Sequence, residues 1–285
     1  MLKRKIYDEL VAWKSSSNGT TAMMIDGARR VGKSYIAEAF AKAEYKSYIL
    51  IDFGRAPTDI LDLFINDSYD LDLFFAKLAA FYATPLHRRE SLIIFDEVQQ
   101  YPRARQLIKY LVADGRFDYL ETGSLIRLKK NVQDIIIPSE EDHIEMFPLD
   151  FEEFLYANGL NEFAISAMRK KFECEESLDE PTHNKMMDLF RKYLLVGGLP
   201  DAVNSYLNDH NIQLVRDIQS EIHDYYAADA SKYDEEKKLK IRRIYDLIPS
   251  NMENKKKRVV AQNIENKRGK TFGDYSDEFE YLISA

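Results

Sequence analysis

Residues 27–34 read Gly-Ala-Arg-Arg-Val-Gly-Lys-Ser and match the spacing G-x-x-x-x-G-K-[ST]. The apolar residues 23–25 precede this stretch, and a segment with helical spacing of apolar residues follows it. Gly27 and Gly32 allow the backbone to turn tightly and to bring its N–H groups close to an anion. The positive end of the following helix dipole faces the same place. The stretch therefore predicts a phosphate-binding loop.

The side chains of this loop suit a nucleotide and its metal ion. Lys33 is expected to reach the β- and γ-phosphates as a point charge, and Ser34 to offer its hydroxyl to Mg²⁺. Arg29 and Arg30 add positive charge, and we expect one of them to face phosphate or a neighbouring subunit. The residues predicted to contact nucleotide in this stretch are Gly27, Ala28, Arg29, Arg30, Val31, Gly32, Lys33, Ser34 and Tyr35.

Strands and helices alternate through the first 150 residues. Apolar residues recur at helical spacing over residues 34–45 and 71–82. Short apolar runs bounded by Gly, Pro or charged residues are typical of buried strands in a parallel sheet. Such runs lie at Thr21–Asp26, Ser47–Phe53, Ser91–Asp96, Phe117–Thr122 and His143–Phe147. The alternation predicts an α/β three-layer sandwich with a parallel sheet.

Two acids, Asp96 and Glu97, directly follow the apolar residues 92–95. Asp96 is expected to hold Mg²⁺ through a water, and Glu97 to orient and deprotonate an attacking water. The alternative interpretation is a strand that simply leaves the sheet on charged residues. The second acid favours hydrolysis over phosphoryl transfer, because a kinase uses its acceptor substrate in place of water.

Beyond residue 150 the pattern is helical, with a break at residues 197–200 (Gly-Gly-Leu-Pro). Helices are expected at 150–156, 163–172, 184–195, 202–208 and 212–226, with an acidic surface loop over 173–184. A third segment is expected to be helical over 235–248, interrupted at Pro249, and to continue with short helices near 259–263 and 274–283. Short helices with basic connectors suggest a helix-turn-helix or winged-helix unit. We therefore divide the chain into a core (1–150), a helical lid (151–230) and a basic, incomplete segment (231–285).

Charge is distributed unevenly along the sequence. Residues 232–270 hold thirteen Lys and Arg against six Asp and Glu, a local charge of +7, whereas the whole chain carries −8. One interpretation is a solvated helical surface. The other is a basic module that contacts the phosphate backbone of DNA or an acidic protein partner.

The composition excludes several classes of protein. The single cysteine, Cys174, excludes an intramolecular disulfide, and the five scattered histidines form no Cys/His cluster that could hold zinc. No apolar run approaches the roughly 18 residues of a membrane span, and the N-terminus lacks the apolar core of a secretion signal. We expect a cytoplasmic protein.

Five motifs in order resemble the prokaryotic AAA-domain ATPases that carry a C-terminal domain of unknown function, relatives of the archaeal ATPases within the AAA+/STAND NTPases. The motifs are GARRVGKS (27–34), LIIFDEVQ (92–99), LETGSL (120–125), MFPLDFEEFL (146–155) and YLLVGGLPDAV (193–203). The resemblance covers residues 1 to about 230 and implies the sheet order 5-1-4-3-2. It also implies that the phosphate-binding loop is a Walker A motif and that residues 96–97 are a Walker B motif.

The resemblance implies further site residues. Ser124, with Thr122 as the second choice, would be sensor 1, which reads the γ-phosphate or positions water. Pro200 would belong to a GxP turn and abut the adenine, although a simple helix stop is an equal alternative. Tyr7 and Trp13 are weaker candidates for the border of the adenine site.

Two features depart from the family pattern. Family members usually continue into a fuller winged-helix region and a restriction-endonuclease-like fold, so we expect a truncated gene or a fragment and carry over no nuclease activity. No arginine finger is evident within the chain: Arg103, Arg105, Arg116 and Arg127 are interpreted as surface arginines. A finger would then act across a subunit interface, in a homo-oligomer.

Together these features predict a Mg²⁺-dependent ATPase in which hydrolysis drives a conformational switch on a DNA or protein partner. Lys33, Glu97 and Ser124 are the predicted catalytic residues, and Ser34 and Asp96 the predicted metal ligands. ATP is preferred over GTP on the resemblance and because no N-K-x-D signature is present. The alternatives are a nucleotide-dependent binding module with little hydrolysis, and a small-molecule kinase.

Overall fold

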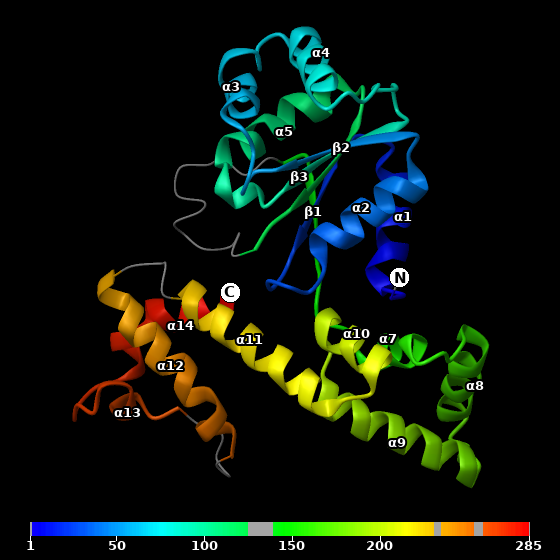
Figure 1. Ribbon diagram of the computed structural model, residues 1–285, viewed down its shortest axis with the longest axis vertical. Helices are drawn as coiled ribbons and strands as arrows, with labels where there is room; N and C mark the ends of the chain where they lie inside the picture. Colours follow the sequence, from blue (N-terminus) through cyan, green and yellow to red (C-terminus); the bar gives the residue numbers. More distant parts are fainter. Residues whose placement is uncertain (1, 125–138, 231–234, 254–258, 285) are drawn as a thin grey trace. The chain divides into compact units, whose positions relative to one another are not determined.

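The computed structural model describes residues 2–124, 139–230, 235–253 and 259–284. The chain forms two compact units, Met1–His210 and Asn211–Ala285. Each unit is described by itself below (Figure 1).

A five-stranded parallel sheet forms the centre of the first unit. Its strands are β1 (Ala22–Asp26), β2 (Ser47–Asp52), β3 (Ser91–Asp96), β4 (Asp118–Thr122) and β5 (Glu141–Glu145). They lie in the order β2-β3-β4-β1-β5, and every neighbouring pair is parallel. The α/β fold class and the order 5-1-4-3-2 are confirmed. Because the strands are parallel, their carboxyl ends meet at one edge, where β1 leads into the phosphate-binding loop and β3 into the two acids.

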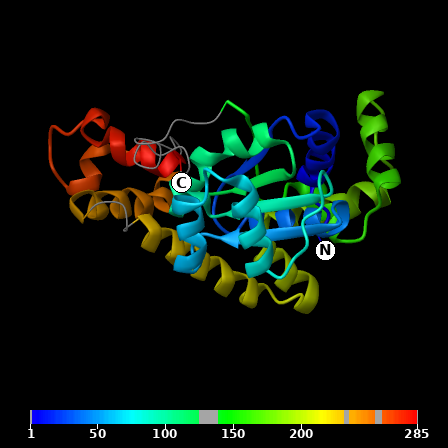
Figure 2. The ribbon, with the colours of Figure 1, turned by 90° about the horizontal axis from the view of Figure 1, so that it is seen from above.

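Helices cover both faces of this sheet, as the strands' apolar character predicts. The helices that precede and separate the strands are α1 (Lys5–Ser17), α2 (Lys33–Glu44), α3 (Thr58–Asn66), α4 (Leu71–Phe81) and α5 (Pro102–Asp114). Met23 and Ile25 of β1 pack with α1 and α2, whereas Ala22 and Met24 pack in the cluster that contains α3, α4 and α5. The three layers can be followed in Figures 1 and 2.

The rest of the first unit is helical. It contains α7 (Phe151–Ala157), α8 (Glu162–Glu173), α9 (Glu180–Val196) and α10 (Pro200–Asp209). Phe154 of α7 joins α9 and α10, because its ring contacts Tyr193 of α9 and Tyr206 of α10 at centroid distances of 5.4 and 6.3 Å. The loop expected over 173–184 is shorter, since α9 begins at Glu180. Asp179 caps that helix by accepting a 3.0 Å hydrogen bond from the Thr182 N–H.

The described part of the second unit contains helices and a 3₁₀ turn but no strand. Its elements are α11 (Ile212–Ala230), α12 (Glu235–Glu253), α13 (Ala261–Glu265), η2 (Phe272–Tyr275) and α14 (Ser276–Ser284). Ile244, Ala261, Ile264 and Tyr275 form its small core. The winged-helix assignment of this segment stays a prediction.

Helix α12 continues through Pro249, where the sequence predicted an interruption. Proline supplies no N–H to the preceding turn. The side chains of Ser250 and Asn251 both donate to the Leu247 carbonyl, at 3.0 and 2.6 Å, and so add bonds to the backbone of the same turn. None of the described helices is long and apolar enough to cross a membrane.

Candidate active site

The phosphate-binding loop leaves the carboxyl end of β1 and enters α2. Both of its glycines have positive φ, 140° at Gly27 and 99° at Gly32, so the pattern correctly locates two positions that disfavour a side chain. At Gly27 the neighbouring backbone also leaves no room for a side chain. A Cβ there would lie 2.3 Å from the Met146 carbonyl oxygen, because the backbone that follows β5 runs against the loop. Gly32 precedes the first residue of α2, so the amino end of the helix opens onto the loop.

Lys33 is buried within the loop. Its Nζ donates hydrogen bonds to the carbonyls of Gly27 and Ala28, at 2.9 and 2.7 Å. Burial lowers its pKa to about 8, and the charges of Glu97 and Asp96 act in the opposite direction. The two strand-tip acids are therefore close enough to the loop to act on its lysine.

Thr122 holds the acidic end of β3 from the neighbouring strand β4. Its hydroxyl donates to the Asp96 carboxylate and accepts a 3.3 Å hydrogen bond from the Glu97 N–H. Asp96 is buried, while Glu97 is half-buried and has a positive φ of 54°. This left-handed conformation ends the strand and begins the 3₁₀ turn η1 (Val98–Gln100).

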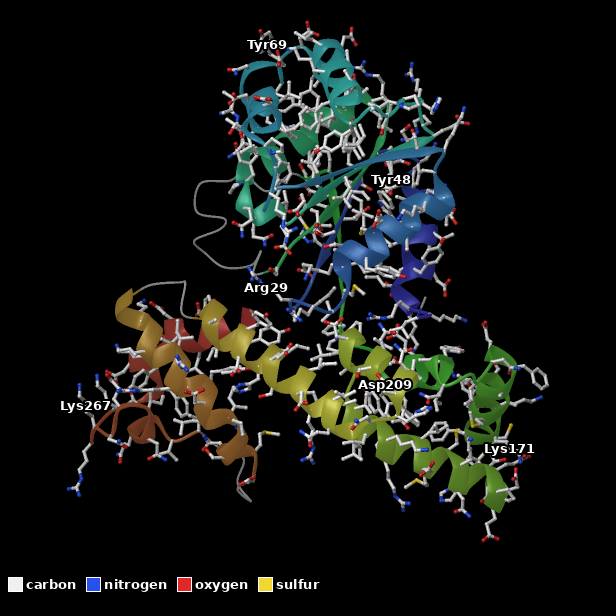
Figure 3. All side chains as sticks on the ribbon, viewed as in Figure 1. Arg29, Tyr48, Tyr69, Lys171, Asp209 and Lys267 are labelled. Atoms are coloured by element: carbon white, nitrogen blue, oxygen red, sulfur yellow. The ribbon has the colours of Figure 1, made fainter. Side chains whose placement is uncertain are left out.

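Glu97 is connected to the phosphate-binding loop by a short chain of side chains. Gln99 Nε2 donates to the Glu97 carboxylate and, at 3.3 Å, to the Ser124 hydroxyl. Arg29 Nε also donates to that hydroxyl, at 3.3 Å. Arg29, labelled in Figure 3, therefore meets Ser124 at the carboxyl edge of the sheet. Ser124 is fully buried between these partners.

Gln99 was not predicted as a site residue. Its signal in the sequence is weak, because the residue pattern does not show how the chain turns after the strand. Only the 3₁₀ turn brings its amide back to Glu97.

The oxygen groups at this edge suit Mg²⁺, which prefers hard oxygen ligands and keeps several waters. Ser34 offers a hydroxyl at the start of α2, and Asp96 offers a buried carboxylate. In the part of the chain that the structure describes, no three His, Cys, Asp or Glu side chains gather as a metal site. Ser34 and Asp96 therefore fit an ion that takes its remaining ligands from phosphate and water.

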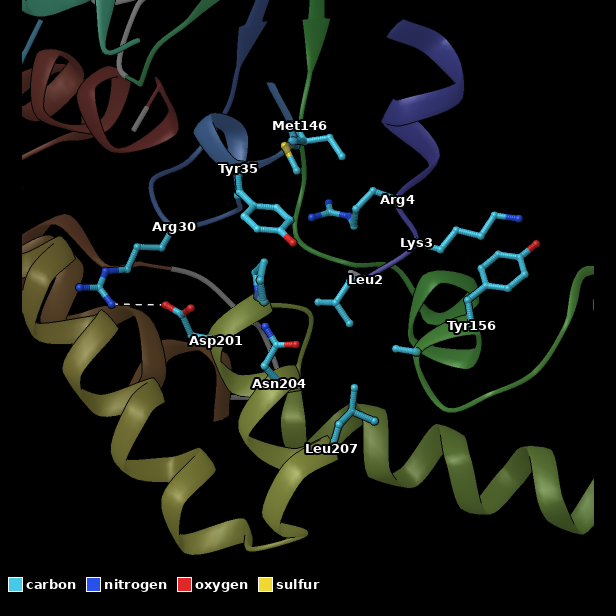
Figure 4. A pocket seen from close by; sticks show the side chains of 14 residues that line it. Leu2, Lys3, Arg4, Arg30, Tyr35, Met146, Tyr156, Asp201, Asn204 and Leu207 are labelled. Carbon is cyan, nitrogen blue, oxygen red and sulfur yellow. Dashed lines mark hydrogen bonds and ion pairs between the residues drawn. The ribbon is translucent and has the colours of Figure 1, made fainter. Parts of the chain in front are cut away.

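A pocket of about 640 Å³ lies beside the phosphate-binding loop, within the first unit (Figure 4). The loop and α2 contribute Arg30, Gly32 and Tyr35 to its wall, and α10 contributes Pro200 and further residues. The complete lining is Leu2, Lys3, Arg4, Arg30, Gly32, Tyr35, Ile36, Met146, Tyr156, Ala157, Pro200, Asp201, Asn204 and Leu207. An ion pair of 3.5 Å between Arg30 and Asp201 joins the loop to α10 at the pocket.

The turn at residues 197–200 both ends a helix and lines the pocket. Gly197 has a φ of 72° after the last residue of α9, and Pro200 begins α10. A Cβ at Gly198 would lie 2.1 Å from the Leu149 carbonyl oxygen, and the Gly198 carbonyl accepts a 2.7 Å hydrogen bond from the Leu149 N–H. The turn is thus held tightly against the segment that leads into α7.

Tyr7 and Trp13, the weaker candidates for the adenine border, do not line this pocket. The Tyr7 ring packs edge-on against Phe40 at 5.9 Å, and Trp13 Nε1 donates to the Thr21 hydroxyl at 3.3 Å. Both side chains belong to the layer between α1, α2 and the sheet. Residues 2–4, just before α1, reach the pocket in their place.

The interpretation of Arg105 as a surface arginine is wrong. Its guanidinium is buried and forms two hydrogen bonds with Glu141, at 3.0 and 2.6 Å. Arg103 is exposed and donates to the Phe64 carbonyl at 3.1 Å, while the half-buried Arg116 pairs with acids beside it. Arg127 lies outside the described residues.

Comparison with known proteins gives two family matches. Residues 19–155 match the model of the AAA domain family, and residues 187–285 match that of a domain of unknown function, DUF8612. No curated protein sequence matches the chain.

Among solved structures, the Walker-type ATPase PABY2304 of Pyrococcus abyssi has a TM-score of 0.58 and 14% identity, with 100% of this chain and 89% of that chain covered. At this identity the likeness concerns the fold alone. PCH-2 of C. elegans has 12% identity over 99% of this chain and 69% of its own, with a TM-score of 0.32 that is too low to indicate a common fold.

Proposed function

Because residues 19–155 match the model of the AAA domain family, we propose that the chain binds ATP with Mg²⁺ and hydrolyses it. The observation that carries the proposal is the connection of Glu97 to the phosphate-binding loop through Gln99, Ser124 and Arg29. A carboxylate held in this way is suited to orient a water opposite a phosphate bound in the loop.

In the proposed reaction the loop N–H groups and Lys33 bind the β- and γ-phosphates. Lys33 exchanges its bonds to the Gly27 and Ala28 carbonyls for phosphate oxygens, which offer it full negative charge. Glu97 accepts a proton from the attacking water, and Ser124 hydrogen-bonds at the γ-phosphate side. The fixed donors of the loop stabilise the charge that spreads over the transferred group.

Mg²⁺, when bound by Ser34 and Asp96, neutralises phosphate charge. Thr122 keeps the Asp96 carboxylate in one orientation through its hydroxyl. The same hydroxyl fixes the Glu97 N–H, so one side chain of β4 orients both acids.

The pocket beside the loop is proposed to take the adenine. The presence of Pro200 in its wall, opposite Gly32 of the loop, supports this role. Tyr35 offers an aromatic ring on which a base can stack. Residues 1–150 would then be the nucleotide-binding core and residues 151–230 the lid, with the basic segment 231–285 contacting DNA or an acidic protein.

The proposal is tested by measuring ATP hydrolysis and the binding of a fluorescent ATP analogue with the purified chain, with and without DNA. Lys33→Ala should abolish binding. Glu97→Gln should bind normally and hydrolyse about 100-fold more slowly, the usual contribution of a general base. Glu90→Gln is the matched control, because Glu90 lies just before the other end of β3 and is 61% exposed.

Each contrary result has a distinct meaning. Unchanged turnover in Glu97→Gln removes Glu97 from the mechanism. Binding without hydrolysis, in the presence and absence of DNA, identifies a nucleotide-dependent binding module. ADP that forms only when an acceptor is added indicates a kinase.

A further inference from the structure

Arg4 is a buried arginine that joins three segments far apart in the sequence. Its Nη1 donates to the Val31 carbonyl at 2.9 Å, and its Nη2 to the Phe147 carbonyl at 2.6 Å. Its Nε donates to the Glu153 carboxylate at 3.2 Å. The phosphate-binding loop, the backbone that follows β5 and helix α7 therefore meet at one guanidinium, which Figure 4 shows beside Tyr35.

Glu153 organises the other end of this connection. One of its carboxylate oxygens accepts from the Lys5 N–H at 2.7 Å, at the start of α1. The other accepts from the Asp150 N–H at 3.2 Å, and Asp150 in return accepts from the Glu153 N–H at 2.8 Å. This capping box begins α7. The Arg4–Glu153 pair thus connects the amino ends of two helices to the loop, and both side chains are buried.

The bond from Arg4 to the Val31 carbonyl has a consequence for the next residue. The Val31 carbonyl and the Gly32 N–H belong to one planar peptide group and point in opposite directions. Holding the carbonyl toward Arg4 therefore aims the Gly32 N–H away from the guanidinium. Gly32 itself has no side chain to fix its conformation, and its φ of 99° is one of several that glycine can adopt.

We propose that Arg4 is a positioning residue of the phosphate-binding loop, and that the Arg4–Glu153 pair transmits the nucleotide state of the loop to helix α7. The inference rests on the proposed binding of nucleotide by this loop. In it, Arg4 orients the Gly32 N–H as a phosphate donor. A shift of the loop on binding pulls on the guanidinium, and Glu153 passes the displacement to α7.

Helix α7 is in turn connected to the pocket wall. The Leu149 N–H donates to the Gly198 carbonyl at 2.7 Å, and Tyr193 of α9 donates its hydroxyl to the Leu149 carbonyl at 2.9 Å. A displacement of the segment before α7 therefore reaches the turn that carries Pro200. The Arg4 guanidinium therefore connects the phosphate-binding loop with the turn beside the proposed adenine pocket.

The test combines ADP affinity with hydrogen exchange of the full chain, measured with and without saturating ADP and Mg²⁺. The variants are Arg4→Met, Arg4→Lys and Glu153→Gln. The matched control is Lys5→Met, because Lys5 is the next residue and also pairs with acids of the α7 amino end, but is exposed and has no bond to the loop.

In the wild type and in Lys5→Met, ADP should slow exchange both in residues 27–36 and in residues 151–157. Arg4→Met should bind ADP about tenfold more weakly, the effect of losing one charge-assisted hydrogen bond. At saturating ADP it should protect residues 27–36 but no longer residues 151–157. Glu153→Gln should keep ADP affinity within about twofold and also lose the response of residues 151–157. Arg4→Lys should recover part of the affinity, because one ammonium can reach only some of the acceptors.

A merely structural role would lower thermal stability and leave the response of residues 151–157 intact, and that result overturns the inference. If Arg4→Met does not fold, Arg4→Lys and Glu153→Gln decide the question by the same exchange measurement. If the wild type binds ADP and every variant shows the same ADP affinity and the same exchange response of residues 151–157 as the wild type, this inference alone is overturned. A wild-type chain that binds no nucleotide overturns the proposed function and the inference together.

Discussion

At the scale of single residues, the depressed pKa of Lys33 gives the site a pH dependence. Burial lowers that pKa to about 8 in the free chain, whereas the lysine of an unfolded chain titrates near 10.5. Phosphate binding needs the ammonium form. Nucleotide affinity should therefore be constant below pH 8 and fall by up to about tenfold per pH unit above it, one proton being taken up on binding.

The same shift predicts how stability changes with pH. Between pH 8 and 10.5 the unfolded chain holds a proton on Lys33 that the folded chain has released, so stability without nucleotide should rise over this interval. Lys33→Met should remove this pH-dependent contribution to stability. Titration of nucleotide binding and urea unfolding from pH 6.5 to 10 measures both, and a wild-type affinity that stays constant to pH 10 would contradict the argument.

Gln99 provides a second prediction at this scale. Its amide connects the Glu97 carboxylate to Ser124, so Gln99→Ala should lower kcat about tenfold by leaving the proposed base free to rotate, with little change in KM. Gln100→Ala is the control, because Gln100 is the next residue of the same turn and is exposed. Equal kcat values for the two variants would show that the amide does not position Glu97.

At the scale of elements, one buried ion pair joins helix α5 to strand β5. Arg105 of α5 bonds both carboxylate oxygens of Glu141, which His143 also contacts at 2.7 Å. Although burial alone would raise the pKa of Glu141, these partners hold it at about 2. Arg105→Met should destabilise the chain by about 3–5 kcal/mol, because it removes the buried partner of the Glu141 charge and leaves only the exposed His143 beside it.

Urea unfolding of Arg105→Met against Arg103→Met measures this contribution. The control removes an exposed arginine from the same helix, and we expect a change within about 0.5 kcal/mol. If the two variants unfold at the same urea concentration, the pair does not hold the helix to the sheet.

The sequence predicts elements better than it predicts side-chain partners. The strands lie within about two residues of their expected bounds, and the phosphate-binding loop is where its glycines indicate, because strand burial and glycine conformation are local properties of the chain. Arg105 was wrongly placed at the surface, because its partner Glu141 comes from a strand distant in the sequence. Gln99 was missed, because it reaches Glu97 through a turn whose shape the pattern does not reveal. The continuation of α12 past Pro249 was missed because proline usually breaks a helix, and no local pattern shows where a helix continues through it.

At the scale of the whole molecule, acidic and basic regions are separated along the chain. Residues 232–270 carry a charge of +7 in a protein of net charge −8. In the described part of this region, Ile244, Ala261 and Ile264 pack with Tyr275 in a small core, while Arg242, Arg243, Lys267 and Arg268 are exposed. Lys267, which is 66% exposed, extends away from the ribbon in Figure 3. The partner of this region, the oligomeric state and the cellular compartment stay predictions.

If the basic region contacts the DNA backbone, its affinity for duplex must depend on salt, because each neutralised phosphate releases counterions. Binding of a labelled duplex from 50 to 300 mM salt should then weaken linearly on logarithmic axes. The double variant Lys267→Gln/Arg268→Gln should lower the slope by about 2, one for each cation that contacts a phosphate. Lys42→Gln is the control, because Lys42 is an exposed lysine of α2 outside the basic region. A slope near zero would exclude backbone contact, and a normal slope that the double variant leaves unchanged would place the contact on other cations of the chain.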